Sequence, residues 1–365
     1  MRIDKERIVF TGGGSVGHVS PNIALIEQLL DKYEIHYIGS YNGIERKLVE
    51  NSRCRYHPIS SGKLRRYFSW KNFIDPFKVF LGIIQAIYQL YLIKPRLVFS
   101  KGGFVGFPVA IAAWILRIPI IIHEADLTIG LANRLVMPLA NKICLTFFET
   151  INQIKIGDRN KILVTGLPLR KAFFNADPDL GRKFCSYNSR DKKIIVVMGG
   201  SLGARKINQI IREALPILVD RYQIIHICGK RMLEEKLENK YYKQFEYLDG
   251  ELFASILSSA DLVIARAGAN TIYELVATGR PGILIPLPES TSRGDQIANA
   301  NYYLSEGFGE VIMDSHLNLN NLLRGIAAVE DRREEIRKAL SKFILPDATQ
   351  IICNLIADLA SKEII

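Results

Sequence analysis

Residues 260–301 read ADLVIARAGANTIYELVATGRPGILIPLPESTSRGDQIANAN, and this stretch decides the fold class. It predicts a buried strand over Leu262–Ala265, a small-residue turn at Gly268 and Ala269, a helix from about Asn270, and a second apolar strand over Gly282–Pro286. Strands that alternate with helices in this way indicate a parallel α/β sheet. The turn also leaves backbone N–H groups open at the start of a helix, where the helix dipole favours a phosphate.

Polar side chains follow this turn and the second strand. Glu274 lies one helical turn after the small residues, within reach of a ribose. Past the second strand, a loop marked by glycine and proline leads to Asp295, Gln296 and Asn299, whose side chains suit the hydroxyls of a sugar. A phosphate-binding turn beside sugar-binding groups predicts a pocket for a nucleotide-linked sugar.

Length and composition set the frame for that pocket. With 365 residues and 48% hydrophobic content, the chain is expected to form two domains. The five cysteines are scattered, which argues against a zinc site and suits a reducing cytosol. The charged start MRIDKER predicts no secretory signal. The longest apolar run, Val79–Ile93, falls short of the ~20 residues of a spanning helix, so the protein is expected to be soluble or peripheral.

Charge is distributed unevenly between the two halves of the chain. Residues 1–165 hold 22 Lys/Arg against 12 Asp/Glu, whereas residues 166–365 hold 26 against 25. Within the first half, Arg53–Arg96 carries nine basic residues and a single acid, Asp75. The first half is therefore expected to face an anionic partner.

The segment 65–93 combines basic and aromatic side chains, and three interpretations of it stay open. It could be a core helix with a solvated basic rim and a narrow polar stripe of Gly82, Gln85 and Gln89. It could instead lie on an anionic membrane surface. Nucleic acid is least favoured, because no RNP, zinc-finger or helix-turn-helix pattern accompanies it. The side chains concerned are Trp70, Phe73, Phe77 and Phe80, interleaved with Arg65, Arg66, Lys71 and Lys78.

The first glycine-rich turn follows the first predicted strand. GGGSVGH over residues 12–18 matches GxGxxG, the dinucleotide fingerprint, ahead of a helix expected over Pro21–Leu30. That fingerprint needs an acid after the second strand, Ile35–Ile38, but glycine and serine stand there. A phosphate-accepting loop is the better interpretation, since its glycines let backbone N–H groups approach an anion closely.

A second unit of the same design spans Arg96–His123. It reads as a strand, the turn KGGFVG, a helix from Pro108 and another strand. His123, Glu124 and Asp126 stand at the carboxyl end of that last strand, where open α/β sheets place ligands. In the alternative interpretation, His123 and Glu124 only cap the next helix.

The second half of the chain repeats this design. Lys192–Leu218 reads as strand, turn GGSLGA and helix, and residues 260–286 follow the pattern again. The repeat predicts two similar βαβ domains with their glycine turns at the carboxyl ends of the strands, facing across a cleft. One domain should take a donor and the other an acceptor. Asp177-Pro178-Asp179 spells the DxD metal pattern, but no buried strand precedes it, so we interpret it as a turn.

Several motifs in order resemble the MurG family of N-acetylglucosaminyltransferases: GGGSVGHVSPNIAL, KGGFVGFP, HEADLTIGLANR, TGLPLRK, MGGSLGARKIN and ARAGANTIYEL…GRPGILIPLP…GDQIANA. The resemblance runs from about Ile8 to Gly307. It implies an α/β fold of GT-B type, built from two Rossmann-like, doubly wound parallel-sheet domains. Residues 1–166 would form the acceptor- and membrane-facing domain and 167–345 the UDP-GlcNAc domain, with a helix in 346–365 packing back on the first.

The resemblance also implies an activity. It is the inverting transfer of GlcNAc from UDP-GlcNAc to the C4 hydroxyl of MurNAc in lipid I, which is linked to undecaprenyl pyrophosphate. The product is lipid II, made for peptidoglycan at the cytoplasmic side of the cell membrane by a peripheral protein. The anionic membrane surface would be contacted through residues 65–93, and no nucleic acid, cofactor or metal is implied.

Site residues follow from the same resemblance. Glu274 would bind the ribose, Arg170 the donor phosphates, and Asp295 with Gln296 the GlcNAc hydroxyls. The other donor contacts implied are Ser15, Ser201, Gly268, Ala269 and Asn270. The acceptor contacts implied are Gly13, Gly14, Gly17, Gly102, Gly103 and Glu124.

The reaction needs a base that takes the acceptor's proton. His18 stands where the family has its active-site histidine, and the ordinary pKa of histidine, near ~6.5, suits the task. Asp126 is the alternative base, and the sequence does not choose between them. Departure of UDP would be eased by helix dipoles and Arg170 rather than by an obligatory metal.

Three other functions compete with this interpretation. A UDP-sugar diacylglycerol glycosyltransferase of the same fold would keep the segment 65–93 and change the acceptor. A UDP-GlcNAc 2-epimerase would need no lipid acceptor, so the basic and aromatic segment argues against it. A nucleic-acid binder would leave both polar clusters unexplained.

Overall fold

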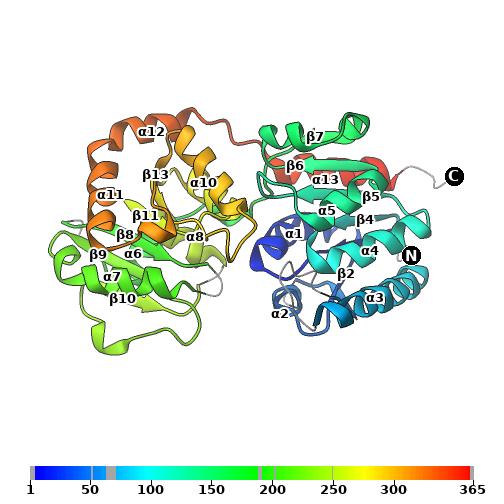
Figure 1. Cartoon of the computed structure of the whole chain (residues 1–365), viewed down its shortest axis with the longest axis horizontal. Helices are drawn as coiled ribbons and strands as arrows, with labels where there is room; N and C mark the ends of the chain where they lie inside the picture. The colour runs from blue at the N-terminus through cyan, green and yellow to red at the C-terminus, as the bar shows by residue number, and fades with distance from the viewer. Residues whose placement is uncertain are drawn as a thin grey trace. The chain divides into compact units, whose positions relative to one another are not determined.

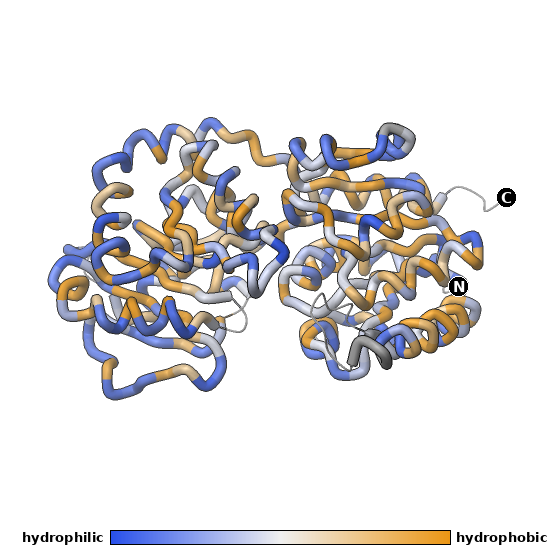
Figure 2. The backbone as a smooth tube through the Cα atoms, in the orientation of Figure 1, coloured by the Kyte–Doolittle hydropathy of each residue, from blue (hydrophilic) through white to orange (hydrophobic). Residues whose placement is uncertain are grey.

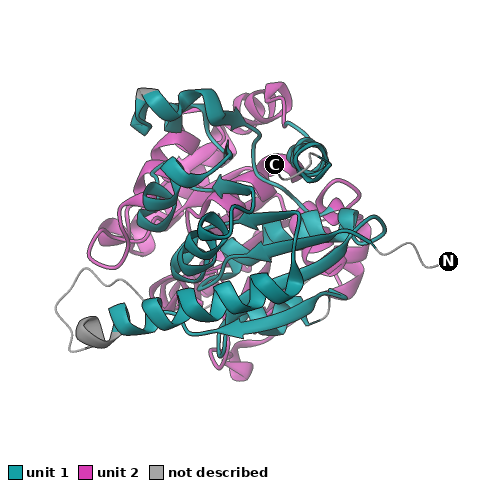
Figure 3. Cartoon of the chain, turned by 90° about the vertical axis from the view of Figure 1, so that its right-hand side faces the viewer, with its two compact units in different colours: residues 1–170, 346–365 teal, residues 171–345 magenta. Residues whose placement is uncertain are grey.

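The computed structural model describes residues 5–50, 52–62, 71–187, 191–200, 203–248 and 250–361. The chain forms two compact units, which Figure 3 colours separately. Unit 1 comprises residues 1–170 and 346–365, and unit 2 comprises residues 171–345. The boundary at Arg170 lies a few residues beyond the position expected from the sequence.

Unit 1 is built on a seven-stranded parallel sheet in the order β3-β2-β1-β4-β5-β6-β7 (Figure 1). Its strands are short runs rich in Ile, Val and Leu, as a sheet covered on both faces requires. They are β1 (Arg7–Thr11), β2 (Glu34–Ser40), β3 (Arg55–Ile59), β4 (Leu97–Ser100), β5 (Ile120–Glu124), β6 (Lys142–Leu145) and β7 (Ile162–Val164).

Helices cover both faces of this sheet and bury two apolar cores. One core joins the sheet to α3 (Lys71–Ile93), α4 (Gly103–Ile115) and α5 (Leu131–Val136). The other joins it to α1 (Val16–Leu29), α2 (Ile44–Val49) and α13 (Ala348–Ala360). Because Ile352 and Ile356 of α13 are fully buried there, a segment from the far end of the described chain completes unit 1.

Unit 2 is built on a six-stranded parallel sheet in the order β10-β9-β8-β11-β12-β13. Its strands are β8 (Lys193–Met198), β9 (Tyr222–Ile227), β10 (Tyr242–Phe245), β11 (Leu262–Ala265), β12 (Gly282–Leu284) and β13 (Gly309–Val311). Its helices are α6 (Pro178–Phe184), α7 (Arg205–Leu218), α8 (Gly250–Ser259), α9 (Ala269–Thr278), α10 (Asp295–Ser305), α11 (Leu319–Asp331) and α12 (Arg333–Lys342).

The two sheets share one strand order around their first strands. In both, the chain builds outward from a central strand in one direction and then switches to the other side, which is the doubly wound arrangement. The predicted α/β class with two Rossmann-like parallel sheets is confirmed. In both units the glycine turns lie at the carboxyl ends of the central strands.

Helix starts differ from the sequence-based expectation in a consistent way. α1 begins at Val16 and α4 at Gly103, so Pro21 and Pro108 lie inside their helices rather than at the first position. Each helix begins directly at its glycine turn. The loop after β9 contains only a short 3-10 turn at Glu235–Leu237.

The DxD pattern has a local structural role. Asp177 is the N-cap of α6, and its carboxylate accepts the N–H of Asp179 at 2.9 Å. Pro178 occupies the first helical position, where its missing N–H costs nothing. Within the described residues, no cluster of three or more His, Cys, Asp or Glu side chains is arranged to hold a metal ion.

Candidate functional site

The first glycine turn of unit 1 joins β1 to α1. Gly12 and Gly14 have φ angles of 147° and 91°, which residues with side chains rarely adopt. Tyr37 of β2 donates its hydroxyl to Gly12 O at 2.6 Å, and Asn22 of α1 donates Nδ2 to Thr11 O at 3.2 Å. Both side chains are fully buried, so the neighbouring strand and helix fix the path of the turn.

His18 lies on the first turn of α1, directly after the glycines. Its Nδ1 lies 2.7 Å from Ser15 Oγ, and both residues are partly exposed. When Nδ1 carries the ring proton and donates it to Ser15 Oγ, Nε2 keeps a lone pair that accepts a proton. The structure thus brings the predicted base together with Ser15, and Gly13 and Gly17 flank the pair. The expected contact of Ser15 with the donor stays a prediction.

A buried carboxylate that the sequence did not point to contacts the same turn. Glu45 of α2 is fully buried and accepts the N–H of Gly14 at 3.3 Å and that of Ser40 at 3.0 Å, and the Ser40 hydroxyl also donates to it. A Cβ built on Gly13 would lie 2.7 Å from Glu45 Cδ. The N–H of Gly14, expected to bind the acceptor, is therefore engaged by a carboxylate of the protein itself.

Replacing Glu45 by alanine is expected to lower the free energy of unfolding by about 2 kcal/mol, because the buried N–H and hydroxyl of Ser40 and the N–H of Gly14 lose their acceptor. The shift of the urea midpoint measures this. Glu50→Ala is the matched control, since Glu50 caps the same helix and forms an exposed pair with Arg46. An equal shift of the urea midpoint in both variants would show that Glu45 has no special stabilising role at this turn.

The second glycine turn joins β4 to α4 and packs against the first turn. Gly102, with φ 82°, is the N-cap of α4, and Gly103 has φ 75°. A Cβ built on Gly103 would lie 2.6 Å from Gly13 O, and one built on Gly102 would lie 2.6 Å from Asn133 Oδ1. Close packing therefore requires glycine at both positions, and it gathers the predicted acceptor residues at one edge of the sheet.

Lys101 precedes the second turn and is 1% exposed. Its Nζ donates to His123 Nδ1 at 2.5 Å, and His123 Nε2 donates to Gly166 O at 2.9 Å. Burial of the ammonium lowers the pKa of Lys101 to about 7, although the nearby carboxylates Glu124 and Asp126 oppose the shift. Burial, together with the charge of Lys101, lowers the pKa of His123 well below its ordinary value. The pair is a polar link across β4 and β5.

The polar groups that follow β5 have separate environments. Glu124 is 5% exposed, and its carboxylate accepts the N–H of Gly130 and the Nδ2 group of Asn133, both at 2.9 Å. Glu124 therefore braces the loop before α5, although Gly130 is the N-cap residue itself. Asp126 is partly exposed, and Arg170 is the last residue of unit 1. The ligand roles expected for all three stay predictions.

In unit 2, the turn between β11 and α9 is held from two sides. Gly268 is the N-cap of α9. Asn299 of α10 is fully buried and donates Nδ2 to Ala267 O at 3.2 Å, which ties α10 to the turn. Arg266, at the end of β11, donates Nη1 to Asp314 Oδ1 at 2.6 Å. Polar contacts therefore anchor the residues before the predicted phosphate turn.

The predicted ribose and sugar ligands lie on the two helices at this turn. Glu274 is on the second turn of α9 and is partly exposed, and Asp295 and Gln296 open α10. Gln296 Oε1 accepts the N–H of Leu287 at 3.0 Å, and Asp295 Oδ2 lies 3.4 Å from Arg293 Nη2. The structure thus brings Gly268, Ala269, Asn270, Glu274, Asp295 and Gln296 to one edge of the second sheet.

The remaining turn, between β8 and α7, contains Gly200 and Gly203 with φ angles of 83° and 73°. Ser201, the expected phosphate ligand there, lies outside the described residues. The N-terminal half of α7 and the loop after β9 line a cavity of about 500 Å³. The lining residues are Arg205, Asn208, Gln209, Arg212, Arg231, Met232, Leu233 and Glu234, none of which was predicted.

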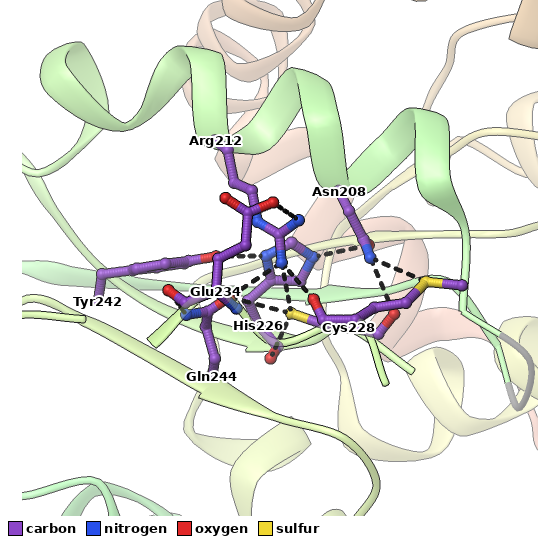
Figure 4. Close-up of polar contacts among 8 residues, drawn as sticks. Asn208, Arg212, His226, Cys228, Glu234, Tyr242 and Gln244 are labelled. Carbon is purple, nitrogen blue, oxygen red and sulfur yellow. Dashed lines mark hydrogen bonds and ion pairs between the residues drawn. The ribbon is translucent and has the colours of Figure 1, made fainter. Parts of the chain in front are cut away.

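A polar network lies beside this cavity (Figure 4). His226 of β9 pairs its Nδ1 with Tyr242 OH at 2.8 Å and its Nε2 with Asn208 Oδ1 at 3.0 Å. Burial lowers the pKa of His226 to about 3, and the charge of Arg212 adds to the shift. Arg212 binds Glu234 at 2.6 Å, which fixes the loop after β9 against α7. We interpret this network as a brace.

The helix α3 attaches to unit 1 through polar side chains. Gln85 Oε1 accepts the N–H of Ser60 at 2.6 Å, and Gln89 bonds to His57. A Cβ built on Gly82 would lie 2.2 Å from Ser60 O, so the helix backbone approaches the sheet edge closely there. The polar stripe predicted on this helix therefore faces the protein.

The opposite side of α3 is apolar and exposed; Figure 2 shows how many hydrophobic residues this helix carries, as an orange run along its backbone. We call this side the α3 outer face; it comprises Phe77, Phe80, Leu81, Ile84, Tyr88, Tyr91 and Leu92, each 47–75% exposed. The core-helix interpretation is therefore wrong. Arg65, Arg66 and Trp70 lie outside the described residues, and the side chains of Lys71 and Phe73 are not described.

The length of α3 also corrects the expectation of too short an apolar run. Asp75–Ile93, with a mean hydropathy of 1.4, is long and apolar enough to cross a membrane by length and composition alone, and 22% of it is buried. Core helices of other proteins meet the same criterion. The packing of Ala86, Leu90 and Ile93 into the first core ties this helix to the sheet of unit 1.

Comparison with known proteins identifies both units. Residues 8–145 match the glycosyltransferase family 28 N-terminal domain, and residues 194–352 match the glycosyltransferase family 28 C-terminal domain. The first matched region lies in unit 1. The second covers most of unit 2 and the start of α13.

Curated relatives match over nearly their whole length. A UDP-N-acetylglucosamine–N-acetylmuramyl-(pentapeptide) pyrophosphoryl-undecaprenol N-acetylglucosamine transferase of Clostridium kluyveri is 48% identical, over 96% of this chain and 99% of the relative. A Legionella pneumophila protein of the same name is 47% identical, over 98% of each chain. A Bacillus cereus protein of that name, numbered 2, is 44% identical, over 97% of this chain and 99% of the relative.

Solved structures share the fold. The crystal structure of Acinetobacter baumannii MurG has a TM-score of 0.74 at 24% identity, covering 97% of this chain and 99% of that chain. A Neisseria meningitidis UDP-GlcNAc 2-epimerase has a TM-score of 0.70 at 13% identity, covering 96% and 100%. Likeness at this level of identity carries the fold alone, so the relatives decide between these families. The chain belongs to glycosyltransferase family 28 and, within it, to the MurG family.

Proposed function

We propose that this protein transfers GlcNAc from UDP-GlcNAc to the C4 hydroxyl of MurNAc in lipid I and so forms lipid II. The observation that carries the proposal is the identity of 44–48% with transferases of that printed activity over nearly their full length. The site geometry agrees with it: unit 1 joins two glycine turns to His18, and unit 2 joins a phosphate turn to Glu274, Asp295 and Gln296.

In unit 2 the proposed roles follow the chemistry of the donor. The N–H groups at the start of α9, around Gly268–Asn270, bind the diphosphate together with the helix dipole. Glu274 accepts hydrogen bonds from the ribose hydroxyls, and Asp295 with Gln296 binds GlcNAc. Ser201 and Arg170 add contacts to the diphosphate, as the family motifs imply.

In unit 1 the proposed roles follow the chemistry of the acceptor. His18 Nε2 takes the proton of the C4 hydroxyl while the oxygen of that hydroxyl forms a bond to C1 of GlcNAc. The bond between C1 and the diphosphate oxygen breaks, UDP leaves with the electron pair, and the configuration at C1 inverts. Ser15 holds the His18 ring through Nδ1. The glycine turns at Gly13–Gly17 and Gly102–Gly103 take the diphosphate of lipid I.

The test is the release of UDP from UDP-GlcNAc by the full chain. We expect release only when a soluble analogue of lipid I is also present. Release without any acceptor would indicate an epimerase-type reaction, and release sustained by diacylglycerol would indicate the other lipid transferase. Either result would contradict the proposal.

We also propose that unit 1 binds the cytoplasmic surface of the cell membrane through the α3 outer face. Aromatic side chains at 61–75% exposure, including Phe77, Phe80 and Tyr88, suit the interface between headgroups and acyl chains. Lys78 and Lys94, on and just after this helix, are exposed and would attract anionic headgroups. A surface location also presents the acceptor site to a lipid-linked substrate.

The double variant Phe77→Ser/Phe80→Ser is expected to bind vesicles of anionic phospholipid roughly thirtyfold more weakly. The reason is that it lacks two exposed aromatic rings whose transfer from water to the membrane interface favours binding. Vesicle flotation measures the bound fraction. Phe148→Ser is the matched control, since Phe148 is 68% exposed in the same unit but lies outside α3. Equal binding of wild type and the double variant would refute the membrane surface.

A further inference from the structure

The two glycine turns of unit 1 differ in the charge buried behind them. Behind the first turn lies Glu45, a fully buried carboxylate that accepts the N–H of Gly14 at 3.3 Å. Beside the second turn lies Lys101, which is 1% exposed and bonds to the neutral ring of His123 at 2.5 Å. The turns therefore present opposite electrostatic environments to one ligand.

Lys101 is placed to act on the second turn. It directly precedes Gly102, the N-cap of α4, and its backbone N–H donates to Thr11 O at 2.9 Å. A Cβ built on Gly12 would lie 2.9 Å from Lys101 Cβ, so the stem of the lysine lies between the two turns. Its amine therefore lies within one side-chain length of the start of α4.

No carboxylate is paired directly with this amine among the described residues, although the charges of Glu124 and Asp126 act on it from farther away. Its hydrogen bond goes to the uncharged Nδ1 of His123. A carboxylate at Glu124 is engaged by the N–H of Gly130 and by Asn133. A buried cation with no paired anion is costly unless a ligand supplies the negative charge.

We propose that Lys101 is the charge partner of the acceptor's diphosphate on the Gly102–Gly103 turn, and that the amine takes up a proton when this diphosphate binds. The idea rests on the proposed function and refines it in one respect. The second turn carries the diphosphate, whereas the first turn, held by Glu45, serves to position His18.

The direction of the pH effect follows from the groups that face Lys101. Burial lowers the pKa of the free amine to about 7, while Glu124, Asp126 and Cys144 act in the opposite direction. The neutral His123 ring accepts its hydrogen bond. A bound diphosphate adds negative charge and raises this pKa. Binding therefore takes a proton from the buffer above about pH 7 and weakens as the pH rises further.

Calorimetry on the wild-type full chain without donor tests this directly. A soluble short-chain analogue of lipid I is titrated at pH 7 in buffers of different ionisation enthalpy. The slope of the observed binding enthalpy against the ionisation enthalpy of the buffer gives the number of protons taken up. Because the free amine is half protonated near pH 7, we expect roughly half a proton per bound analogue. Titration with UDP is the second arm, and no uptake through Lys101 is expected there.

The variant Lys101→Met keeps most of the length of the side chain and removes its charge. At pH 7 we expect its KM for the analogue to rise roughly tenfold with kcat little changed, and the pH dependence of KM above pH 7 to flatten. Its proton uptake should also disappear. Lys155→Met, which removes an exposed charge of the same unit, is the matched control and should behave as wild type.

Three results would overturn the proposal: no proton uptake by the wild type, uptake that persists in Lys101→Met, or Lys101-dependent uptake with UDP instead of the analogue. If Lys101→Met does not fold, Lys101→Gln replaces it, and the wild-type measurement remains decisive. Failure of the proposed function is distinguishable, since the wild type would then release no UDP from UDP-GlcNAc and the analogue.

Discussion

Replacing His18 by alanine is expected to lower kcat roughly a thousandfold and to leave the KM for UDP-GlcNAc within about threefold of wild type. The reason lies in the Ser15–His18 pair, whose 2.7 Å contact orients the ring and leaves Nε2 to accept the proton. Without the ring, the C4 hydroxyl attacks without a base. Most of the proposed donor contacts, Glu274, Asp295 and Gln296 among them, lie in unit 2, so donor binding should survive. Steady-state UDP release measures both constants.

Two further variants make this result specific. Ser15→Ala should lower kcat by roughly tenfold, because the ring then loses the bond that fixes its tautomer and orientation. The second variant, Asp126→Asn, tests whether Asp126 rather than His18 is the base. If Asp126→Asn abolished turnover while His18→Ala kept at least a tenth of it, Asp126 would be the base and His18 a binding residue.

Glu274→Ala is expected to raise the KM for UDP-GlcNAc roughly a hundredfold with a smaller change in kcat, because charge-assisted hydrogen bonds to the ribose hydroxyls are lost. The side chain is partly exposed on α9, and the turn before it is held by Asn299 and Arg266. Its removal should therefore spare the fold of unit 2. Steady-state kinetics with varied donor measures the effect, and thermal unfolding checks the fold.

A donor that contains deoxyribose gives the matched chemical control. Wild type should discriminate strongly against the 2′-deoxyuridine donor, whereas Glu274→Ala should treat both donors nearly alike, since the carboxylate that reads the hydroxyl is absent. Equal discrimination by the two proteins would show that another group binds the ribose. Glu274→Gln, which keeps an acceptor oxygen, should fall between them.

Local patterns were enough to predict the strands and turns of the site. Leu262–Ala265 with Gly268, and the strand before Gly102 with its turn, each occupy a few consecutive residues, so apolar runs and glycines mark them. Repetition of this unit predicted two similar βαβ domains, and the family resemblance added that both are doubly wound. Helix starts were misjudged at Pro21 and Pro108, because a glycine turn opens a helix earlier than proline suggests.

Long-range contacts were not predictable from the same patterns. Glu45 meets Gly14 across 31 positions, and Lys101 meets His123 across 22, and neither pair has a periodic signal. The orientation of α3 was not predictable from the sequence for a different reason. An apolar stripe usually indicates the core side of a helix, but here Gln85 is satisfied by the N–H of Ser60, so the polar stripe turns inward.

The return of α13 to unit 1 has a consequence for the order of folding during synthesis. Ile352 and Ile356 complete the core shared with α1 and β1, and Thr349 Oγ1 donates to Leu169 O at 3.2 Å. At about 5–20 residues per second, the ribosome needs roughly ten to thirty-five seconds to make residues 171–345 before this helix emerges. The unit that is translated first is therefore the last to be finished. Until then it exposes an apolar groove to the chaperones of the cell.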